Sequence, residues 1–131
     1  NNMVLDCEKG RQTAGSIILL WDRHDAENQQ ICVVPLDNGN YALQLVHSGQ
    51  VLDVEKASKK SGAQVIQYNW NGGANQQWPL VPAGDGYYYI VSALSGMTLD
   101  VSGGRANAGS SIIVYQPHYG DNQKFKFLPV K

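Results

Sequence analysis

A carboxylate, an aromatic ring and a carboxamide pair recur three times along the chain at one fixed spacing. The sets are Asp6, Trp21, Asn28 and Gln29; Asp53, Tyr68, Asn75 and Gln76; and Asp100, Tyr115, Asn122 and Gln123. In every set the ring follows the carboxylate by 15 residues and precedes the asparagine by 7. A pyranose has an apolar face that stacks on such a ring, and its vicinal hydroxyls exchange hydrogen bonds with a carboxylate and an amide. The pattern therefore favours binding of an uncharged sugar.

The sets belong to a longer repeat. Equivalent positions lie 47 residues apart, since 75 − 28 and 122 − 75 both equal 47. Leu5-Asp6, Gly15 and Pro35 recur in the same register as Leu52-Asp53, Gly62 and Pro82, and as Leu99-Asp100, Gly109 and Pro129. A fixed period of this length indicates a repeat architecture. The chain of 131 residues is within the size of one domain, so we expect a single domain over 1–131 with repeats at 3–49, 50–96 and 97–131.

Each unit is predicted to consist of β-strands. Apolar residues come in short bursts between Gly, Asn and Asp residues, and no stretch keeps a helical spacing. In the second unit this predicts strands at 51–54, 65–68, 78–81 and 87–91. Three units of 47 residues need 141 and the chain has 131, so one fourth strand of twelve is missing. We expect an upstream part of a longer polypeptide to supply it, the alternative being an open sheet edge.

Several columns of the repeat have a structural interpretation. The columns Ile31/Trp78/Phe125 and Val33/Leu80/Phe127 are large and apolar with strand alternation, which predicts that they form the core. The Gly15 column indicates a backbone position that a Cβ atom would strain. Cys7 shares its column with two valines and is predicted to point inward, whereas Cys32 is predicted to face water, a poor arrangement for a disulfide.

The recurring polar residues could also be structural. The Asp column alternates with apolar neighbours, so we expect its carboxylates to point away from the barrel interior without loss of hydration. Taken singly, the Asp is also typical of a turn partner for backbone amides, and Asn and Gln are typical of loop ties. His24 and His118 share one column, and His118 either adds a polar sugar contact or is a solvated loop residue. Only the joint recurrence of these columns with an aromatic ring favours a sugar.

Composition and charge do not favour other classes of partner. The net charge is −1 and charged residues make up 16% of the chain, which argues against nucleic acid and anionic membranes as partners. No apolar run reaches the roughly 20 residues that span a bilayer, so no membrane insertion is expected. The N-terminus lacks a signal region, and we expect that any secretion signal has been removed and that the protein is secreted or extracellular. Neither a cofactor nor a metal is expected.

The sequence resembles the ricin-type β-trefoil lectins, also grouped as family 13 of the carbohydrate-binding modules, whose hallmark is a Gln-x-Trp motif in three repeats. The motif stands here as Gln76-Gln77-Trp78, with altered copies Gln29-Gln30-Ile31 and Gln123-Lys124-Phe125. The resemblance covers the whole chain, and GAQVIQYNWNGGANQQW and IIVYQPHYGDNQKF carry it most specifically. It implies an all-β fold, a six-stranded barrel capped by three hairpins about a pseudo-threefold axis.

The resemblance also implies roles for the recurring residues. The Asp would bind sugar hydroxyls, the ring would stack, the Asn would complete the hydroxyl contacts and the Gln would steady the Asp. Galactose or N-acetylgalactosamine is the family's commonest ligand. Together with three such sites, the resemblance implies a multivalent lectin for glycans or glycoconjugates that contain these sugars. The alternatives are a module that targets a glycoside hydrolase to xylan or arabinogalactan, and a protein-binding trefoil such as a protease inhibitor. Attachment to a larger enzyme or toxin chain is compatible with the lectin and with the targeting module.

An enzymatic role is disfavoured by the spacing of the acids. Each unit has one recurring carboxylate, whereas glycoside hydrolysis normally needs two carboxylates flanking one bond. Further acids, namely Asp22, Asp25 and Glu27, lie with His24 in the first loop alone, which is typical of a solvated loop. The sequence therefore predicts a protein without catalytic residues.

Overall fold

The computed structural model describes residues 3–104 and 107–130, which form an all-β fold. Its strands are β1 (Met3–Cys7), β2 (Ile18–Asp22), β3 (Ile31–Pro35), β4 (Tyr41–Leu45), β5 (Val51–Val54), β6 (Val65–Tyr68), β7 (Leu80–Gly84), β8 (Tyr87–Ile90), β9 (Thr98–Val101), β10 (Ile112–Tyr115) and β11 (Phe125–Lys126). Short 3₁₀ helices are η1 (Glu8–Gly10), η2 (Glu27–Gln29), η3 (Glu55–Ala57), η4 (Ala74–Gln76), η5 (Ser102–Gly104) and η6 (Asp121–Gln123). Each unit thus has one 3₁₀ helix after its first strand and another at its Asn-Gln pair.

The strands of the second unit lie close to their predicted positions. β5 and β6 have the predicted bounds, and β8 ends one residue before the predicted Val91. β7 begins at Leu80 and not at the predicted Trp78, because Trp78 forms an isolated bridge to Tyr41 of the first unit. The described residues contain eleven strands, which confirms the count from the repeat.

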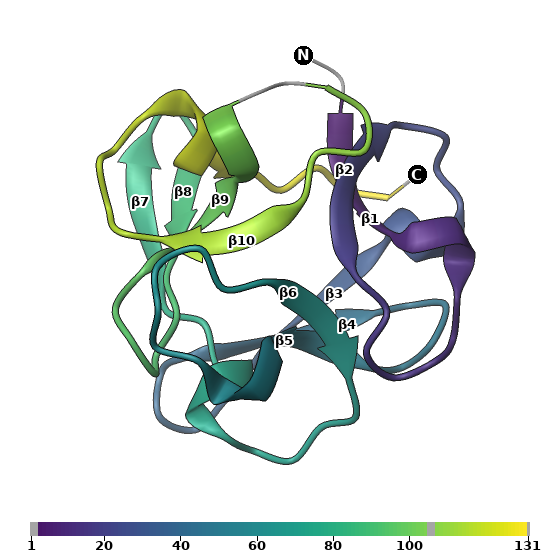
Figure 1. The fold of residues 1–131 in the computed structure, drawn as a ribbon, viewed down its shortest axis with the longest axis horizontal. Helices are drawn as coiled ribbons and strands as arrows, with labels where there is room; N and C mark the ends of the chain where they lie inside the picture. The colour runs from purple at the N-terminus through teal and green to yellow at the C-terminus, as the bar shows by residue number, and fades with distance from the viewer. Residues whose placement is uncertain (1–2, 105–106, 131) are drawn as a thin grey trace.

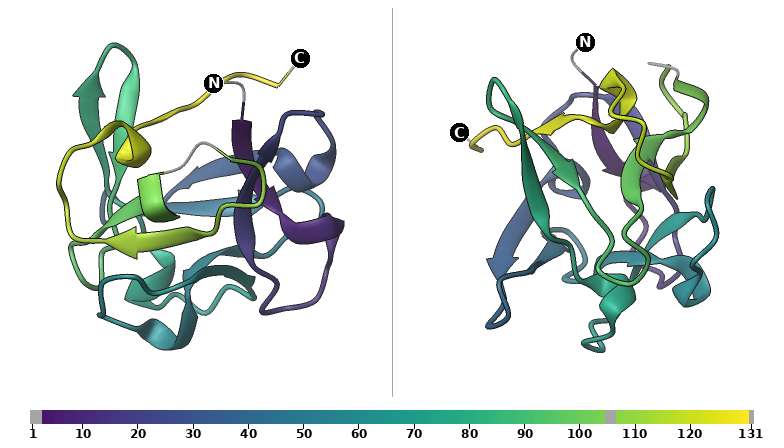
Figure 2. Two further views of the ribbon diagram at one scale, coloured as in Figure 1. Left: turned by 45° about the horizontal axis from the view of Figure 1, so that its top comes forward. Right: turned by 90° about the vertical axis from the view of Figure 1, so that its left-hand side faces the viewer.

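Strand pairing follows the same plan in each unit. The first two strands pair antiparallel as β1–β2, β5–β6 and β9–β10, and these pairs lie around a common centre (Figure 1). The hairpins β3–β4 and β7–β8 are also antiparallel and extend to one side of the molecule in the side view of Figure 2. The chain therefore has the pseudo-threefold arrangement expected from its period.

Hydrogen bonds between units repeat with the same period. Gly15 N–H donates to the Gln67 carbonyl at 2.8 Å, and Gly62 N–H to the Val114 carbonyl at 2.7 Å. Gly109 N–H closes the ring with a bond of 2.7 Å to the carbonyl of Leu20. These glycines have φ of 94, 93 and 92°, a region that residues with a Cβ atom rarely adopt. The glycine column thus serves the backbone, as the sequence predicts.

The core fills the space enclosed by the three units. Trp78 is its largest fully buried side chain, and its indole N–H donates to the Leu52 carbonyl at 3.1 Å. Cys7 is buried and Cys32 is exposed, as predicted, and both are free thiols. Because buried side chains pack at near-crystalline density, this core fixes the strands that carry the polar sets.

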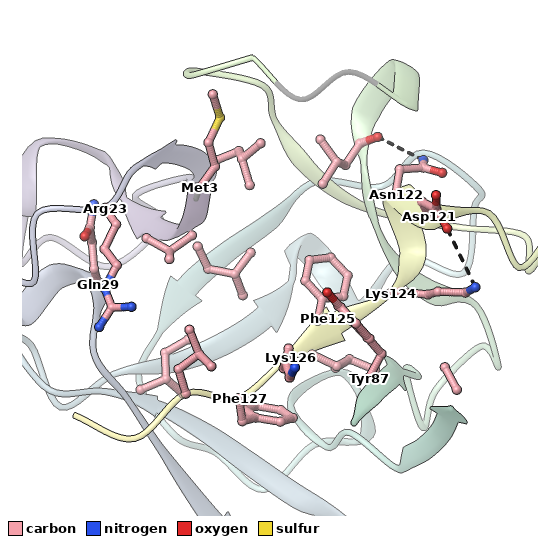
Figure 3. Close-up of a pocket in the computed structure, with 18 of the residues that line it drawn as sticks. Met3, Arg23, Gln29, Tyr87, Asp121, Asn122, Lys124, Phe125, Lys126 and Phe127 are labelled. Carbon is pink, nitrogen blue, oxygen red and sulfur yellow. Dashed lines mark hydrogen bonds and ion pairs between the residues drawn. The ribbon is translucent and has the colours of Figure 1, made fainter. Parts of the chain in front are cut away.

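Part of the predicted core is less buried than the sequence indicates. Ile31 and Phe125, equivalent to the fully buried Trp78, are only half-buried. Phe127 is 38% exposed, so its assignment to the core is wrong. Phe125 and Phe127 both line a groove between β1 and β11 (Figure 3), which is why their rings are less buried than that of Trp78. The described residues also contain no helix long and apolar enough to cross a membrane.

Candidate functional site

The recurring carboxylates lie at the centre of three equivalent polar clusters. Asp6, Asp53 and Asp100 are only 4, 4 and 3% exposed, so the expectation that these carboxylates keep their hydration is wrong. The reason is local, because the 3₁₀ helix at each Asn-Gln pair packs against the strand that carries the Asp. Buried carboxylates need compensating hydrogen bonds, and these come from the same 3₁₀ helix.

The glutamine after each asparagine ties the carboxylate to the neighbouring loop. In the middle cluster Gln76 Nε2 donates to Asp53 Oδ2 and to the Asn69 carbonyl, both at 2.8 Å, while its Oε1 accepts from Asn71 N–H at 2.7 Å. The 2.8 Å bond to the carboxylate is repeated by Gln29 and Gln123. A buried amide with its donors and acceptor all paired is a strong positional constraint.

The asparagine binds the other carboxylate oxygen. The Nδ2 atoms of Asn28, Asn75 and Asn122 lie 3.3, 3.1 and 3.2 Å from the Oδ1 atoms of their carboxylates. Each Nδ2 also donates to the backbone carbonyl that follows the Asp, at 3.1 to 3.2 Å. Because these contacts use the amide nitrogen, the amide oxygen is the group that can accept a hydrogen bond from a hydroxyl.

The aromatic ring lies on the same sheet face as the carboxylate. Tyr68 is paired directly with Val51, which stands two residues before Asp53 on β5. Residues two apart on a strand share a face, and directly opposed residues do so as well. The register Val4–Trp21 and Thr98–Tyr115 repeats this arrangement. The three rings are 43 to 44% exposed, so each is partly open to solvent on the sheet face that carries the carboxylate.

Two of the clusters contain an imidazole. His24 Nε2 lies 3.6 Å from Asp6 Oδ2, and His118 Nε2 lies 3.5 Å from Asp100 Oδ2. In both rings Nδ1 accepts a backbone N–H, from Ala26 at 3.2 Å and from Gly120 at 3.1 Å, so the proton of the neutral ring is on Nε2. These histidines lie beside the carboxylate while their side chains are 45 and 46% exposed to solvent.

In the middle cluster an asparagine takes the place of the imidazole. Asn71 Oδ1 accepts from Gly73 N–H at 2.8 Å, which repeats the backbone contact of the histidine Nδ1.

Burial raises the pKa of Asp53 above its usual value, hydrogen bonds from Gln76 and Asn75 partly offset this, and the nearby charge of Glu55 raises the pKa further. The middle carboxylate is thus harder to ionise than a solvated one.

Two exposed rings next to the clusters were missed by the sequence analysis. Trp70, two residues after Tyr68, is 47% exposed, and Tyr119 is 65% exposed with its ring at an edge-on 5.4 Å from that of Tyr89. Trp70 shares its column with Arg23 and Pro117, and Tyr119 with Asp25 and Gly72. A search for recurring residue types cannot find them, because they occur in one unit each.

Within residues 3–104 and 107–130, no group of three or more His, Cys, Asp or Glu residues is placed to hold a metal ion.

An all-β fold of three units, each with one such cluster at the same place in the repeat, defines a β-trefoil with three polar clusters. The chain belongs to the ricin-type β-trefoil lectin domain-like family, which matches it over residues 1–68, 28–115 and 74–130. The sequence resemblance to these lectins is thereby confirmed. No curated relative matches the chain.

Solved structures with the same fold include designed and natural proteins. ThreeFoil, a designed threefold symmetric protein, has a TM-score of 0.93 and 43% identity over 95% of this chain and 89% of its own. The exo-β-1,3-galactanase 1,3Gal43A from Clostridium thermocellum has a TM-score of 0.92 and 35% identity over 95% of this chain, which spans 27% of the galactanase. The Macrolepiota procera ricin B-like lectin, solved in complex with lactose, shares the fold at a TM-score of 0.79 and 20% identity, over 95% of this chain and 85% of its own.

Proposed function

We propose that the chain is a non-catalytic, multivalent lectin that binds galactose or N-acetylgalactosamine in glycans, with each of the three polar clusters forming a sugar pocket. The observation that carries this proposal is the threefold recurrence of a buried carboxylate, fixed by Gln and Asn, on the same sheet face as an exposed ring. An anionic acceptor fixed in advance binds vicinal hydroxyls with little loss of conformational entropy. The ring supplies the stacking surface for the apolar face of the sugar.

The comparisons support a galactose-type ligand. The ricin B-like lectin of Macrolepiota procera was solved with lactose, a galactoside, and the C. thermocellum enzyme is a galactanase. A non-catalytic role fits pockets that are each built around one recurring carboxylate, since glycoside hydrolysis normally uses two. Three weak pockets would hold a surface with many sugar copies through avidity, which raises apparent affinity by about 10²–10⁴ when the geometry allows.

A second candidate is a module that targets a glycoside hydrolase to its polysaccharide. It is favoured by the 35% identity to part of a galactanase, of which this chain spans 27%. Arabinogalactan and xylan are the polysaccharides to test. In both candidates the protein acts outside the cell, because such glycans are displayed there. Detection of the natural protein in the extracellular fraction of its host checks this part of the proposal.

The test is a glycan array followed by calorimetric titration of the best ligand. The unmodified chain is compared with Asp53→Asn and Asp100→Asn, and with Asp37→Asn as a control that makes the same change at an exposed loop. We expect galactosides to bind, each pocket variant to lose one site, and the control to keep all sites. Strong binding to arabinogalactan or xylan without binding of simple galactosides would favour the targeting module. Absence of glycan binding by a folded chain would refute both candidates and favour a protein-binding trefoil.

A further inference from the structure

The loop of the third cluster carries a tyrosine in a strained backbone conformation. Tyr119 has a φ of 64°, in the left-handed region that disfavours a residue with a Cβ atom. The same position of the repeat is Asp25 in the first unit and Gly72 in the middle unit, with φ of 66 and 78°. Glycine adopts this conformation without steric cost and aspartate tolerates it, whereas a bulky residue there is an outlier. The path of the loop therefore does not favour a tyrosine at this position.

Burial does not compensate for the strain at Tyr119. The residue is 65% exposed, and its ring meets that of Tyr89 edge-on, with the ring centroids 5.4 Å apart and the ring planes at 73°. An edge-on pair covers a face of only one of its two rings, so aromatic surface stays open to solvent. An exposed ring on a strained backbone indicates a role outside the packing of the fold.

The backbone of Tyr119 is tied to the third cluster. Its N–H donates to Gln123 Oε1 at 3.1 Å, and Gln123 Nε2 donates to Asp100 Oδ2 at 2.8 Å. One side chain therefore separates the backbone of Tyr119 from the carboxylate of this cluster. The buried amide of Gln123 fixes where the ring of Tyr119 begins relative to the pocket.

Four rings follow one another from the third pocket toward β8, and we call this set the aromatic strip. The ring of Tyr115, which is the stacking ring of the pocket, lies 6.3 Å from that of His118. Tyr119 comes next in the chain, and Tyr89 on β8 meets its ring. The loop that follows β10 runs past the β7–β8 hairpin, which brings the third unit beside the second (Figure 1). The strip is thus continuous with the pocket and crosses from one unit to the next.

The repeat confines the outer half of the strip to the third pocket. The residues equivalent to Tyr119 and Tyr89, which lie 47 positions earlier, are Gly72 and Ala42, and neither has a ring. The charged residues that follow Tyr119 pair with each other, since Lys124 Nζ lies 3.7 Å from Asp121 Oδ1. They therefore do not select an acidic or a basic ligand for the strip.

We propose that Tyr119 and Tyr89 form a subsite for a second sugar unit, so that the third pocket binds a neutral disaccharide or longer glycan more tightly than a single galactose. The inference rests on the proposed function, because the first sugar unit must occupy the pocket at Tyr115. The next unit of the glycan then continues along the strip, where open ring faces stack on its apolar side. The phenolic hydroxyls of the two tyrosines exchange hydrogen bonds with its hydroxyl groups.

The test is a sugar titration of the intact chain followed by NMR of its backbone amides, which reads each pocket separately. The reporters are equivalent residues of the three clusters, Ala26, Gly73 and Gly120, whose N–H groups donate to the imidazole or amide of their own cluster. The probes are galactose, lactose and β-1,3-galactobiose. We expect galactose to shift all three reporters, and the third pocket alone to bind at least one disaccharide about two- to tenfold more tightly than galactose.

The variant Tyr119→Gly separates a binding role from a packing role. It removes the ring and introduces the residue that suits this backbone, so the midpoint of thermal unfolding should not fall. The galactose affinity of the third pocket should stay unchanged, while its preference for the disaccharide disappears. Tyr89→Ala, which copies Ala42, should weaken the preference in the same way. The matched control Asp25→Gly makes the same backbone change in the first unit and should leave the preference of the third pocket intact.

The outcomes separate the subsite from the proposed function. If no sugar shifts any reporter, the proposed function fails and the subsite fails with it. If galactose shifts the reporters but the third pocket binds no disaccharide more tightly, the subsite alone is wrong. A preference that the middle pocket shares, or that persists in Tyr119→Gly, would also overturn the subsite. Loss of stability in Tyr119→Gly with an unchanged preference would assign the two tyrosines to packing alone.

Discussion

The substitution Gln76→Ala tests whether the buried amide network holds the middle pocket together. Gln76 is 0% exposed, and it joins Asp53 to the loop at Asn69 and Asn71 through hydrogen bonds of 2.7 to 2.8 Å. Alanine removes all of these contacts and leaves the carboxylate and two backbone groups without this partner. We expect a large loss of stability and a loss of sugar binding by this pocket.

The magnitude follows from the kind of bond that is lost. A hydrogen bond to a charged group is worth about 1.5–3 kcal/mol, and a buried polar group left unsatisfied costs about 1–3 kcal/mol. Water entering the space left by the side chain recovers part of this, which gives a net cost of about 3–5 kcal/mol. For a domain of this size that corresponds to a fall of about 10–20 °C in the midpoint of thermal unfolding.

The assay is denaturant unfolding of the variant beside Gln77→Ala, the same change one residue later. Gln77 makes its hydrogen bonds to Asn38, Asn40 and Gly72 at the half-exposed surface, where water can replace them. We expect the control to lose less than about 1.5 kcal/mol, the upper end for a neutral hydrogen bond. If Gln76→Ala costs no more than the control, the reasoning that places the buried amide at the centre of the pocket is wrong.

Three further predictions concern pH, backbone strain and thiol chemistry. Because burial raises the pKa of Asp53, acidification through that pKa protonates Asp53 in the folded chain before it does so in the unfolded chain. The contribution of Asp53 to stability therefore rises on acidification, while the sugar affinity of the middle pocket falls. Sugar titration at several pH values, with the other two pockets disabled by Asp→Asn substitutions, should show this fall in affinity, and a flat profile would contradict it. Gly62→Ala should lower the unfolding free energy by about 1–2 kcal/mol through its φ of 93° alone, since nothing lies within 4 Å of the added Cβ; calorimetry showing no loss would refute the strain argument. Burial raises the pKa of Cys7 to about 11, so a thiol reagent should modify Cys32 alone in the native chain and both thiols after unfolding, and rapid native modification of Cys7 would disprove its burial.

The repeat made much of the fold predictable. The period of 47 residues turned weak strand signals into three aligned copies, and β5 and β6 have the predicted bounds. The glycine column could be predicted because a residue without Cβ, kept at one place in every unit, indicates a positive φ. The bounds of β7 could not, because Trp78 pairs with Tyr41 of another unit and not with a strand of its own.

The buried state of the carboxylates could not be predicted from alternation. Period-two alternation says which face of a strand a side chain occupies, but not what covers that face. Asp53 is buried because η4 lies over it, and η4 lies there because Gln76 bonds both the carboxylate and the preceding loop. The contacts of His24 and His118 with their carboxylates depend on the same loop path.

The sequence by itself determined the unit, its three copies, and the residue types that meet in each pocket, because these follow from spacing along the chain. Only the tertiary structure decided how each pocket is assembled, since the bonds from Gln to Asp join residues 23 apart through a fold of the backbone. It also decided that equivalent residues differ, as Leu5 does from Leu52 and Leu99. Burial is a property of neighbours in space, and a repeat specifies equal residues without specifying equal surroundings.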